Sequence, residues 1–291
     1  MFNQKNKKMK KKLMLAVAGI IMFSGIISPY YCLGQNQKAL VCKYLTTLPS
    51  GKPEDDGMLQ KYRMTAVYTN MDIYGNFTGK TKVTGDYTRG FKGGYSLWNN
   101  VFVSDSKSKA EPFSEGKKQD FMENFKYIPS DSMMKEEAFK SFPTAIDNIF
   151  ARNLIWDMMG VEIFAWHYND SLKLNKVFVI PNVKGEFAMA EIGKYNHESI
   201  QLCWTGISFM NNELCAVIEY RALNNKVEIT TGNIKTKGTE QYWGNTWISL
   251  KSKQIEFAQI FSSTFQEIEV QGMSNKFIAK TIRELKVERI K

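Results

Sequence analysis

The stretch SIQLCWTGISFMNNELCAVIEYRAL, residues 199–223, carries the clearest β-hairpin pattern in this chain of 291 residues. Apolar side chains recur at every second position in it, which is the period of a strand with one buried face. These positions are Ile200, Leu202 and Trp204 in the first half, and Leu214, Ala216, Ile218 and Tyr220 in the second. The stretch therefore predicts two antiparallel strands joined by a turn near Asn211.

The length of that turn decides which residues face each other. A three-residue loop at 210–212 places Trp204 opposite Ile218 and Leu202 opposite Tyr220, so apolar side chains meet on one face. A two-residue turn would instead set the tryptophan opposite a glutamate. We therefore expect the three-residue loop, in which asparagine tolerates the left-handed backbone conformation.

The cysteines do not predict a disulfide framework. In the expected register Cys215 lies beside Ile207, too far along the strand from Cys203 for a disulfide. With Cys42 these make an odd number, in a chain long enough to build a hydrophobic core. We expect buried thiols, and one bridge from Cys42 to either of the others stays open as an alternative.

Residues 1–34 are predicted to form a secretory signal peptide. Six lysines and no acidic residue in 1–12 precede an apolar run at 13–27, the two parts of such a signal. The run is shorter than the roughly 18–20 apolar residues that a membrane-spanning helix needs. Cleavage near Gly34 would release an exported protein into the periplasm or outer envelope. Two alternatives are a membrane anchor and attachment of lipid to Cys32.

The charge balance changes when the signal is set aside. The whole chain has a formal net charge of +10, and without the six lysines of the signal this falls to +4. A surplus of this size favours solubility and does not predict a nucleic-acid-binding surface. The content of lysine, asparagine and isoleucine is typical of a bacterial protein.

Residues 35–291 are predicted to form a single α+β domain. Strand patterns at 61–104 indicate a first meander, a helical insert follows at 118–160, and a second meander occupies 175–291. Consecutive strands, then helices, then more strands predict helices gathered on one face of an antiparallel sheet. We expect a large curled antiparallel β-sheet, half-barrel-like, covered on one face by helices.

The helical insert and the last segment of this domain have distinct sequence patterns. In the helical insert we expect short helices at 119–127 and 131–142, and a longest helix that Pro143 opens, that runs to Met159 and that stops at Gly160. The last segment, 276–290, fits either a strand or a helix.

No catalytic, cofactor or metal motif is found in the sequence. The stretch GNFTGKT at 75–81 resembles a phosphate-binding loop but has one residue too few between its glycines and leads into a strand. His197 is expected to be a solvated loop residue and His167 a partly buried structural one, without metal-ligand spacing. We expect no cofactor, no metal and no enzymatic activity; a hydrolase using His197 is the weakest alternative.

Aromatic and sulfur-containing side chains supply the candidate binding residues. They would either pack a solid core against the helices or line an apolar cavity between the sheet and the helices. The cavity candidates are Trp98, Phe150, Met158, Trp204, Trp243, Trp247, Phe257 and Phe261. Methionines on the helices, Met133, Met134, Met158 and Met159, would give such a cavity an adaptable wall.

The run YWGNTWISLKSKQIEF, residues 242–257, places an aromatic strand before a basic turn and a returning strand. With a signal peptide, two meanders and a helical insert, this run resembles the periplasmic lipoprotein carrier family (LolA-like, including outer-membrane lipoprotein-sorting proteins). The resemblance implies a half-barrel capped by helices and a lipid-binding cavity.

Two functions are therefore expected of the exported chain. The first is binding of a lipid or a lipoprotein acyl chain in an apolar cavity, without catalysis. The alternative is a structural or adhesive envelope module that lacks a ligand cavity and has an envelope protein as its partner. Neither the ligand nor the oligomeric state follows from the sequence.

Overall fold

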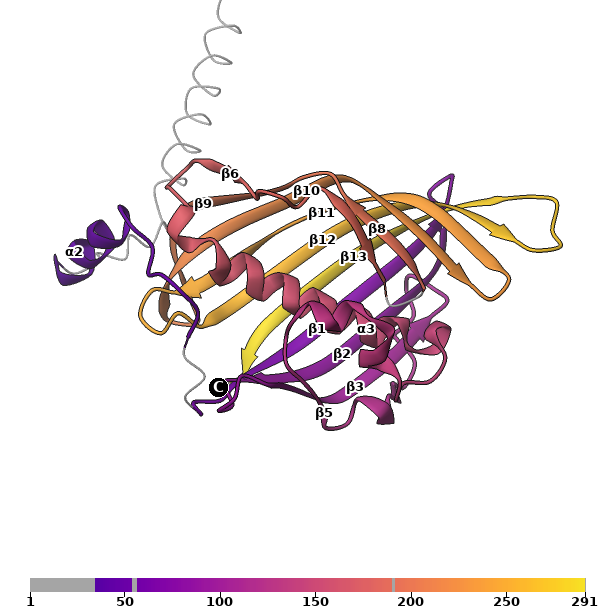
Figure 1. Cartoon of the computed structure of the whole chain (residues 1–291), viewed down its shortest axis with the longest axis horizontal. Coiled ribbons are helices and arrows are strands. Elements are labelled where there is room, and N and C mark those ends of the chain that lie inside the picture. Colours follow the sequence, from indigo (N-terminus) through magenta and orange to yellow (C-terminus); the bar gives the residue numbers. More distant parts are fainter. Residues whose placement is uncertain (1–34, 54–56, 190–191, 291) are drawn as a thin grey trace, which may run out of the picture. The chain divides into compact units, whose positions relative to one another are not determined.

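The computed structural model describes residues 35–53, 57–189 and 192–290 (Figure 1). The predicted signal peptide and Cys32 lie outside the described residues. The chain divides into two units, residues 1–42 and 43–291. Helix α2 (Gln35–Tyr44) begins in the first unit, and the sheet, the core and the cavities described below belong to the second.

The second unit is built on one antiparallel β-sheet, as the sequence predicted. Within the described residues thirteen strands take part, and their order is β4-β3-β2-β1-β13-β12-β11-β10-β8-β7, with β5 on β3 and β9 between β10 and β6. The two edges of the sheet are not paired with each other there, so the sheet is open. The strands are β1 (Gln60–Asp72), β2 (Phe77–Arg89), β3 (Ser96–Ser106), β4 (Lys117–Lys118), β5 (Phe125–Tyr127), β6 (Val177–Val179), β7 (Gly185–Ala188), β8 (Gly193–His197), β9 (Ile200–Met210), β10 (Glu213–Thr231), β11 (Ile234–Ser249), β12 (Ile255–Val270) and β13 (Phe277–Ile290).

The segment that the sequence left open between strand and helix is a strand. β13 pairs along its length with β12 on one side and with β1 on the other. It therefore joins the second meander to the first, and Figure 1 shows the last strand lying beside the earliest ones.

The β9–β10 hairpin confirms the predicted pairs but not the predicted loop. Trp204 faces Ile218 and Leu202 faces Tyr220, as expected. The turn itself has only two residues, Asn211 and Asn212, both with positive φ (54° and 67°), the conformation that matches the twist of the strands. A register shift between Val217 and Ile218 takes up the extra residue and restores the pairing of apolar side chains on one face.

That register shift also moves one cysteine. Cys215 lies opposite Ser208, one position away from the predicted neighbour Ile207. Cys42, Cys203 and Cys215 are all free thiols.

The structure has one long helix where several helices were expected. α3 (Ala145–Glu162) continues through Gly160, and a π-helical turn follows at Ile163–His167. A glycine inside a helix weakens it by about 1 kcal/mol relative to alanine, which the packing of the flanking residues Met158 and Val161 offsets, since both are fully buried.

The other expected helices form irregular segments. The 119–127 region consists of a 3₁₀ turn at Asp120–Met122 followed by β5, and the 131–142 region consists of 3₁₀ turns at Asp131–Met134 and Glu136–Phe139. Isolated helices of this length are marginal unless tertiary contacts support them. A helical cover as extensive as predicted is therefore absent from the described residues.

A buried arginine fixes the 3₁₀ segment to α3. Arg152 donates hydrogen bonds to both carboxylate oxygens of Glu136, at 2.8 and 3.1 Å, and to Asn148 at 2.6 Å. Its guanidinium carbon also lies 4.5 Å from the ring centroid of Phe139. These contacts hold a segment whose own backbone hydrogen bonds are limited to short 3₁₀ turns.

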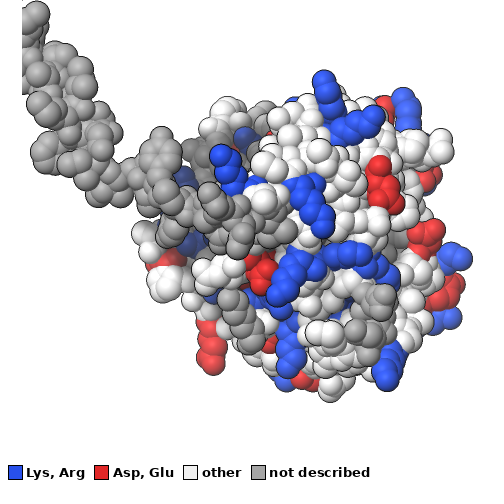
Figure 2. Space-filling model, turned by 90° about the vertical axis from the view of Figure 1, so that its left-hand side faces the viewer, with Lys and Arg blue, Asp and Glu red and all other residues white. Residues whose placement is uncertain are grey.

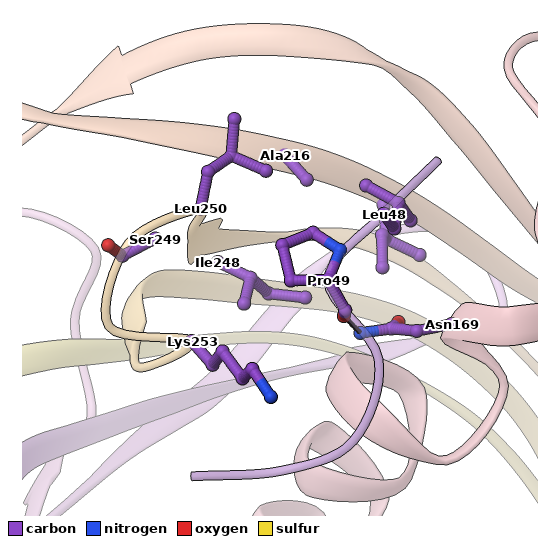
Figure 3. Close-up of a pocket in the computed structure, with 9 residues that line it drawn as sticks. Leu48, Pro49, Asn169, Ala216, Ile248, Ser249, Leu250 and Lys253 are labelled. Atoms are coloured by element: carbon purple, nitrogen blue, oxygen red, sulfur yellow. Dashed lines mark hydrogen bonds between the residues drawn. The ribbon is translucent and has the colours of Figure 1, made fainter. Parts of the chain in front are cut away.

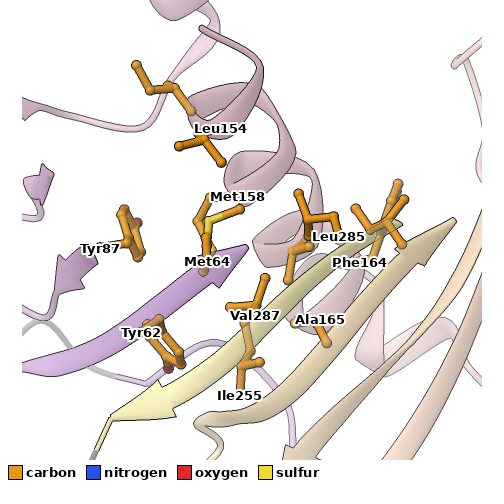
Figure 4. Packing of buried hydrophobic residues seen from close by; sticks show 14 of the residues in the cluster. Tyr62, Met64, Tyr87, Leu154, Met158, Phe164, Ala165, Ile255, Leu285 and Val287 are labelled. Atoms are coloured by element: carbon orange, nitrogen blue, oxygen red, sulfur yellow. The ribbon is translucent and has the colours of Figure 1, made fainter. Parts of the chain in front are cut away.

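The hydrophobic core lies between α3 and the face of the sheet on which α3 packs, here called the inner face. Leu154 and Met158 of the helix belong to one cluster with Met64 of β1 and Leu285 of β13 (Figure 4). The Cδ1 atom of Leu154 lies 3.3 Å from where a Cβ on Gly85 would stand. The missing side chain on β2 thus makes room for the helix.

Replacing Leu154 tests this contact between helix and sheet. Leu154→Ala removes a fully buried side chain, and we expect the free energy of unfolding to fall by about 2–5 kcal/mol. Leu223→Ala, at a position that is 42% exposed, should change it by less than about 1 kcal/mol. Urea denaturation of both variants gives the comparison, and equal losses would contradict the described packing.

Candidate functional site

The candidate site is a cavity of about 400 Å³ beside α3, here called the first cavity. The helix and the π-helical turn supply one wall, and β8, β11 and the segment before β9 supply the other. Its apolar lining consists of Met134, Trp156, Met159, Ile163, Phe164, Tyr168, Ile180, Val183, Phe187, Met189, Ile200 and Tyr242. Ile163 and Phe187 are 44% and 39% exposed, so they form the rim through which a ligand would enter.

A second cavity of about 340 Å³ adjoins the first. Its walls are more polar, because residues of β12 and β13 such as Ser262, Thr264 and Thr281 line it together with Phe150 of α3. The two cavities share the side chains of Asn153, Met189, Tyr195, Glu240 and Arg283.

A group of charged side chains occupies the junction of the two cavities. Nη1 of Arg283 donates to Asp157 of α3 at 3.0 Å, and Nη2 lies 3.9 Å from Glu240 of β11. The Tyr195 hydroxyl donates to the other oxygen of Glu240 at 2.7 Å. We call Asp157, Arg283 and Glu240 the junction cluster.

The register of the sheet explains how the junction cluster forms. Arg283 stands directly opposite Tyr68 on β1 and Ser262 on β12. On β12 the inner-face side chains Ser262 and Thr264 are short, so the arginine can extend across them toward Glu240. The same short side chains leave the space of the second cavity.

Burial sets the protonation of the cluster. Burial raises the pKa of Asp157 to about 6, although the attraction of Arg283 acts in the opposite direction. Burial alone would lower the pKa of Arg283, but the interactions with Asp157, Tyr68 and Glu240 together outweigh it and raise that pKa. Burial and Glu240 raise the pKa of Tyr195. Near neutral pH the arginine is therefore charged and the tyrosine neutral.

A smaller hollow elsewhere is not a ligand site. It measures about 10 Å³ and is bounded by Leu48, Pro49 and the ends of β10 and β11 (Figure 3). This is room for about a single water molecule.

The predicted site residues lie in three different places, namely a cavity wall, the buried core and the outer face of the sheet. Phe150 lines the second cavity. Trp98, Met158 and Trp204 are fully buried in the core. The remaining four lie on the outer face of the sheet, where Trp243 stacks on Phe261 and Trp247 packs on Phe257, with ring centroids 6.2 and 5.3 Å apart.

These four side chains lie on the outer face, and not in the cavity as predicted, because successive residues of a strand point to opposite faces of the sheet. Tyr242 of β11 lines the first cavity, so its neighbour Trp243 must point to the opposite face; it is 44% exposed. The aromatic pattern identified the strand correctly but did not tell which face the helix covers. Of the four methionines, Met134 and Met159 line the first cavity, whereas Met133 and Met158 belong to the core.

The two histidines also differ from the sequence prediction. His197 lies in β8 and lines the first cavity, and burial lowers its pKa. His167 is exposed at the end of the π-helical turn, with its ring 4.7 Å from that of Tyr168. The described residues contain no group of His, Cys, Asp or Glu that could hold a metal ion.

Two further surface properties bear on the site. Among the described residues, no helix combines the length and the apolar character needed to cross a membrane. On the face shown in Figure 2, basic and acidic side chains are interspersed with uncharged ones.

The comparisons with known proteins assign no family. No protein-family model matches the chain. No curated protein matches it either. Among solved structures, one described as "Lipid-protein interactions in lipovitellin" aligns with probability 1.00, a TM-score of 0.43 and 12% sequence identity, over 80% of this chain and 25% of that chain. The chain thus spans a quarter of that protein's length, and a similarity of this degree assigns no function. The resemblance to periplasmic lipoprotein carriers stays a prediction.

The raised pKa of Asp157 predicts how stability depends on pH. Between the unfolded value of about 3.9 and the folded value of about 6, the folded protein keeps a proton that the unfolded chain has lost. The unfolded state then binds fewer protons, so this group makes stability fall as pH rises through that window. The loss is at most about 3 kcal/mol, because one pKa unit corresponds to about 1.4 kcal/mol.

Asp157→Asn should remove this fall, which is measured by urea denaturation at several pH values between about 4 and 7. The matched control is Glu284→Gln, which lies next to Arg283 in the chain but on the outer face, and which should keep the wild-type profile. Identical pH profiles for wild type and Asp157→Asn would show that the pKa of this carboxyl is not raised.

Proposed function

We propose that this protein binds a lipid-like molecule in the first cavity and does not catalyse a reaction. The observation that carries the proposal is a cavity of about 400 Å³ with a mainly aliphatic and aromatic lining. Sites for small molecules have volumes of about 300–1,000 Å³ and are lined mostly by such side chains. The second cavity extends the available space beyond the junction cluster.

The walls suit a flexible apolar chain. Met134 and Met159 contribute unbranched thioether side chains that can adjust to ligands of different shape. Trp156 supplies a broad apolar surface, and its indole nitrogen is already satisfied because it donates to the carbonyl oxygen of Met133 at 2.9 Å. The tryptophan therefore needs no polar partner from the ligand.

The arrangement of sheet and helix supports a container function. α3 packs on the inner face of the sheet, and both cavities lie between the two. We propose that the sheet curls around this space as a half-barrel and that α3 closes one side. Carriage of a lipid or a lipoprotein acyl chain would use this form.

The proposed location is the periplasm or outer envelope, after removal of a signal near Gly34. This part rests on the sequence, in which six lysines precede the apolar run at 13–27. An exported protein between two membranes would meet lipid molecules in water, where an apolar cavity is needed to shield their chains.

One observation favours a structural or adhesive module as the alternative. The outer face carries two aromatic pairs in register, Trp243 with Phe261 and Trp247 with Phe257. Trp243 is exposed and the other three are half-buried. Aromatic side chains are common at the centres of protein interfaces. In that case an envelope protein would bind the outer face.

Substitutions at two equally exposed positions distinguish lipid binding in the first cavity from protein binding at the outer face. Ile163 at the cavity rim and Trp243 on the outer face are each 44% exposed, so a glutamate at either should leave folding intact. Ile163→Glu brings a charge to the entrance of an apolar cavity, and we expect it to lower the amount of bound lipid about tenfold or more. Trp243→Glu should leave the bound lipid unchanged.

The measurement is mass spectrometry of the intact full-length protein after incubation with liposomes of a total bacterial lipid extract and re-isolation. Circular dichroism confirms that both variants are folded. A wild-type protein that carries no lipid would overturn the proposal, as would equal loss of lipid in both variants.

A further inference from the structure

The junction cluster places three charged groups inside the proposed binding space. Arg283, Asp157 and Glu240 have side chains that are 13%, 11% and 16% exposed. Charges with so little contact to water are poorly screened, so they interact strongly with any polar group brought beside them. The polar part of a bound molecule therefore has to match this cluster.

The mixed sign of the cluster disfavours charged ligands. A carboxylate or phosphate placed at the junction would meet the carboxylates of Asp157 and Glu240, while Arg283 is already paired with the first of them. A cationic group would meet the guanidinium. Although the cluster has one more carboxylate than guanidinium, Asp157 already accepts from Arg283 and Glu240 from the Tyr195 hydroxyl. In either case the ligand would lose its hydration without gaining a counter-charge that lacks a hydrogen-bond partner.

Two groups at the junction can still form hydrogen bonds, and they indicate which ligand groups the junction can bind. Nε of Arg283 is buried and has no hydrogen-bond partner among the described residues. A buried donor without a partner costs about 1–3 kcal/mol, which an oxygen atom of a ligand would recover. The Tyr195 hydroxyl, which donates to Glu240, still has lone pairs that can accept a hydrogen bond from a ligand hydroxyl.

The tyrosines and the histidine described beside the cluster leave this balance unchanged. The tyrosines that face it are Tyr68 of β1, Tyr195 of β8, Tyr220 of β10 and Tyr242 of β11, and burial raises the pKa of each of them. Burial lowers the pKa of His197, the histidine of the first cavity. At a pH of about 8 these five groups are therefore neutral, and the junction cluster carries its two carboxylates and one guanidinium.

We propose that the site selects lipid-like molecules whose polar group is uncharged and contains an oxygen acceptor, such as an alcohol, an ester or an amide. Fatty acids and cationic amphiphiles are bound less well. The apolar chain lies in the first cavity and the polar group reaches the junction cluster. This inference rests on the proposed function and adds the chemical class of the ligand.

The test compares three probes with the same chain and different head groups, namely dodecanol, dodecanoate and dodecyltrimethylammonium. Isothermal titration calorimetry with the full-length protein at a pH of about 8 gives the dissociation constants, below the solubility limit of dodecanol and below the critical micelle concentrations of the two charged probes. We expect dodecanol to bind at least about tenfold more tightly than either charged probe, since a like charge in a poorly screened site costs more than 1.4 kcal/mol.

Two variants connect the selectivity to the cluster. Asp157→Asn and Glu240→Gln each remove one negative charge while keeping an oxygen acceptor, and each should tighten dodecanoate binding about fivefold or more while changing dodecanol binding less than about threefold. If one of these variants does not fold, the other still tests the selectivity. The control is again Glu284→Gln, whose side chain is exposed on the outer face, and it should leave all three affinities unchanged.

The outcomes distinguish the two proposals. If dodecanoate binds to the wild type as tightly as dodecanol, or if both variants leave their ratio unchanged, the selectivity is overturned and the lipid-binding function stands. If none of the three probes binds, the proposed function fails, and the selectivity fails with it.

Discussion

The pairing of β13 between β1 and β12 is the constraint on which the rest of the structure depends. It joins two meanders that are separated in the chain by the whole helical insert, and so makes one sheet of them. The same register sets Arg283 opposite Tyr68 and within 3.0 Å of Asp157 on α3. The last strand thus completes both the sheet and the candidate site. Non-local pairing of this kind is costly in chain entropy, and the long ladders on both sides of β13 compensate for it.

The inner face of the sheet changes character along its strands, and this change creates the cavities. Toward one end Met64, Leu285 and Val287 are fully or almost fully buried against the second half of α3. Toward the other end the same strands carry Asn70 and Thr281, joined by a hydrogen bond of 2.9 Å. Close packing fills the first region completely. In the second, short polar side chains cannot reach the helix, so space remains between helix and sheet.

The junction cluster is costly for stability, which supports a role in binding. Replacing buried ion pairs by apolar residues is often neutral or stabilising. The raised pKa of Asp157 reflects that cost, because burial outweighs the attraction of Arg283. Groups with perturbed pKa values in a cavity are candidates for functional residues on physical grounds.

Local patterns in the sequence determined the strands, their alternation and most of the hairpin pairing, because a period of two is a property of each strand alone. They determined Trp204 opposite Ile218 but not the bulge that makes a two-residue turn compatible with that pair. They also located the aromatic residues of β11 without telling that Trp243 faces outward and Tyr242 inward. Only the tertiary structure decided which face of the sheet the helix covers, and therefore which residues line the cavity. The junction cluster could not be predicted from the sequence for the same reason. Asp157 and Arg283 are 126 residues apart in the chain, and only the strand order brings them together.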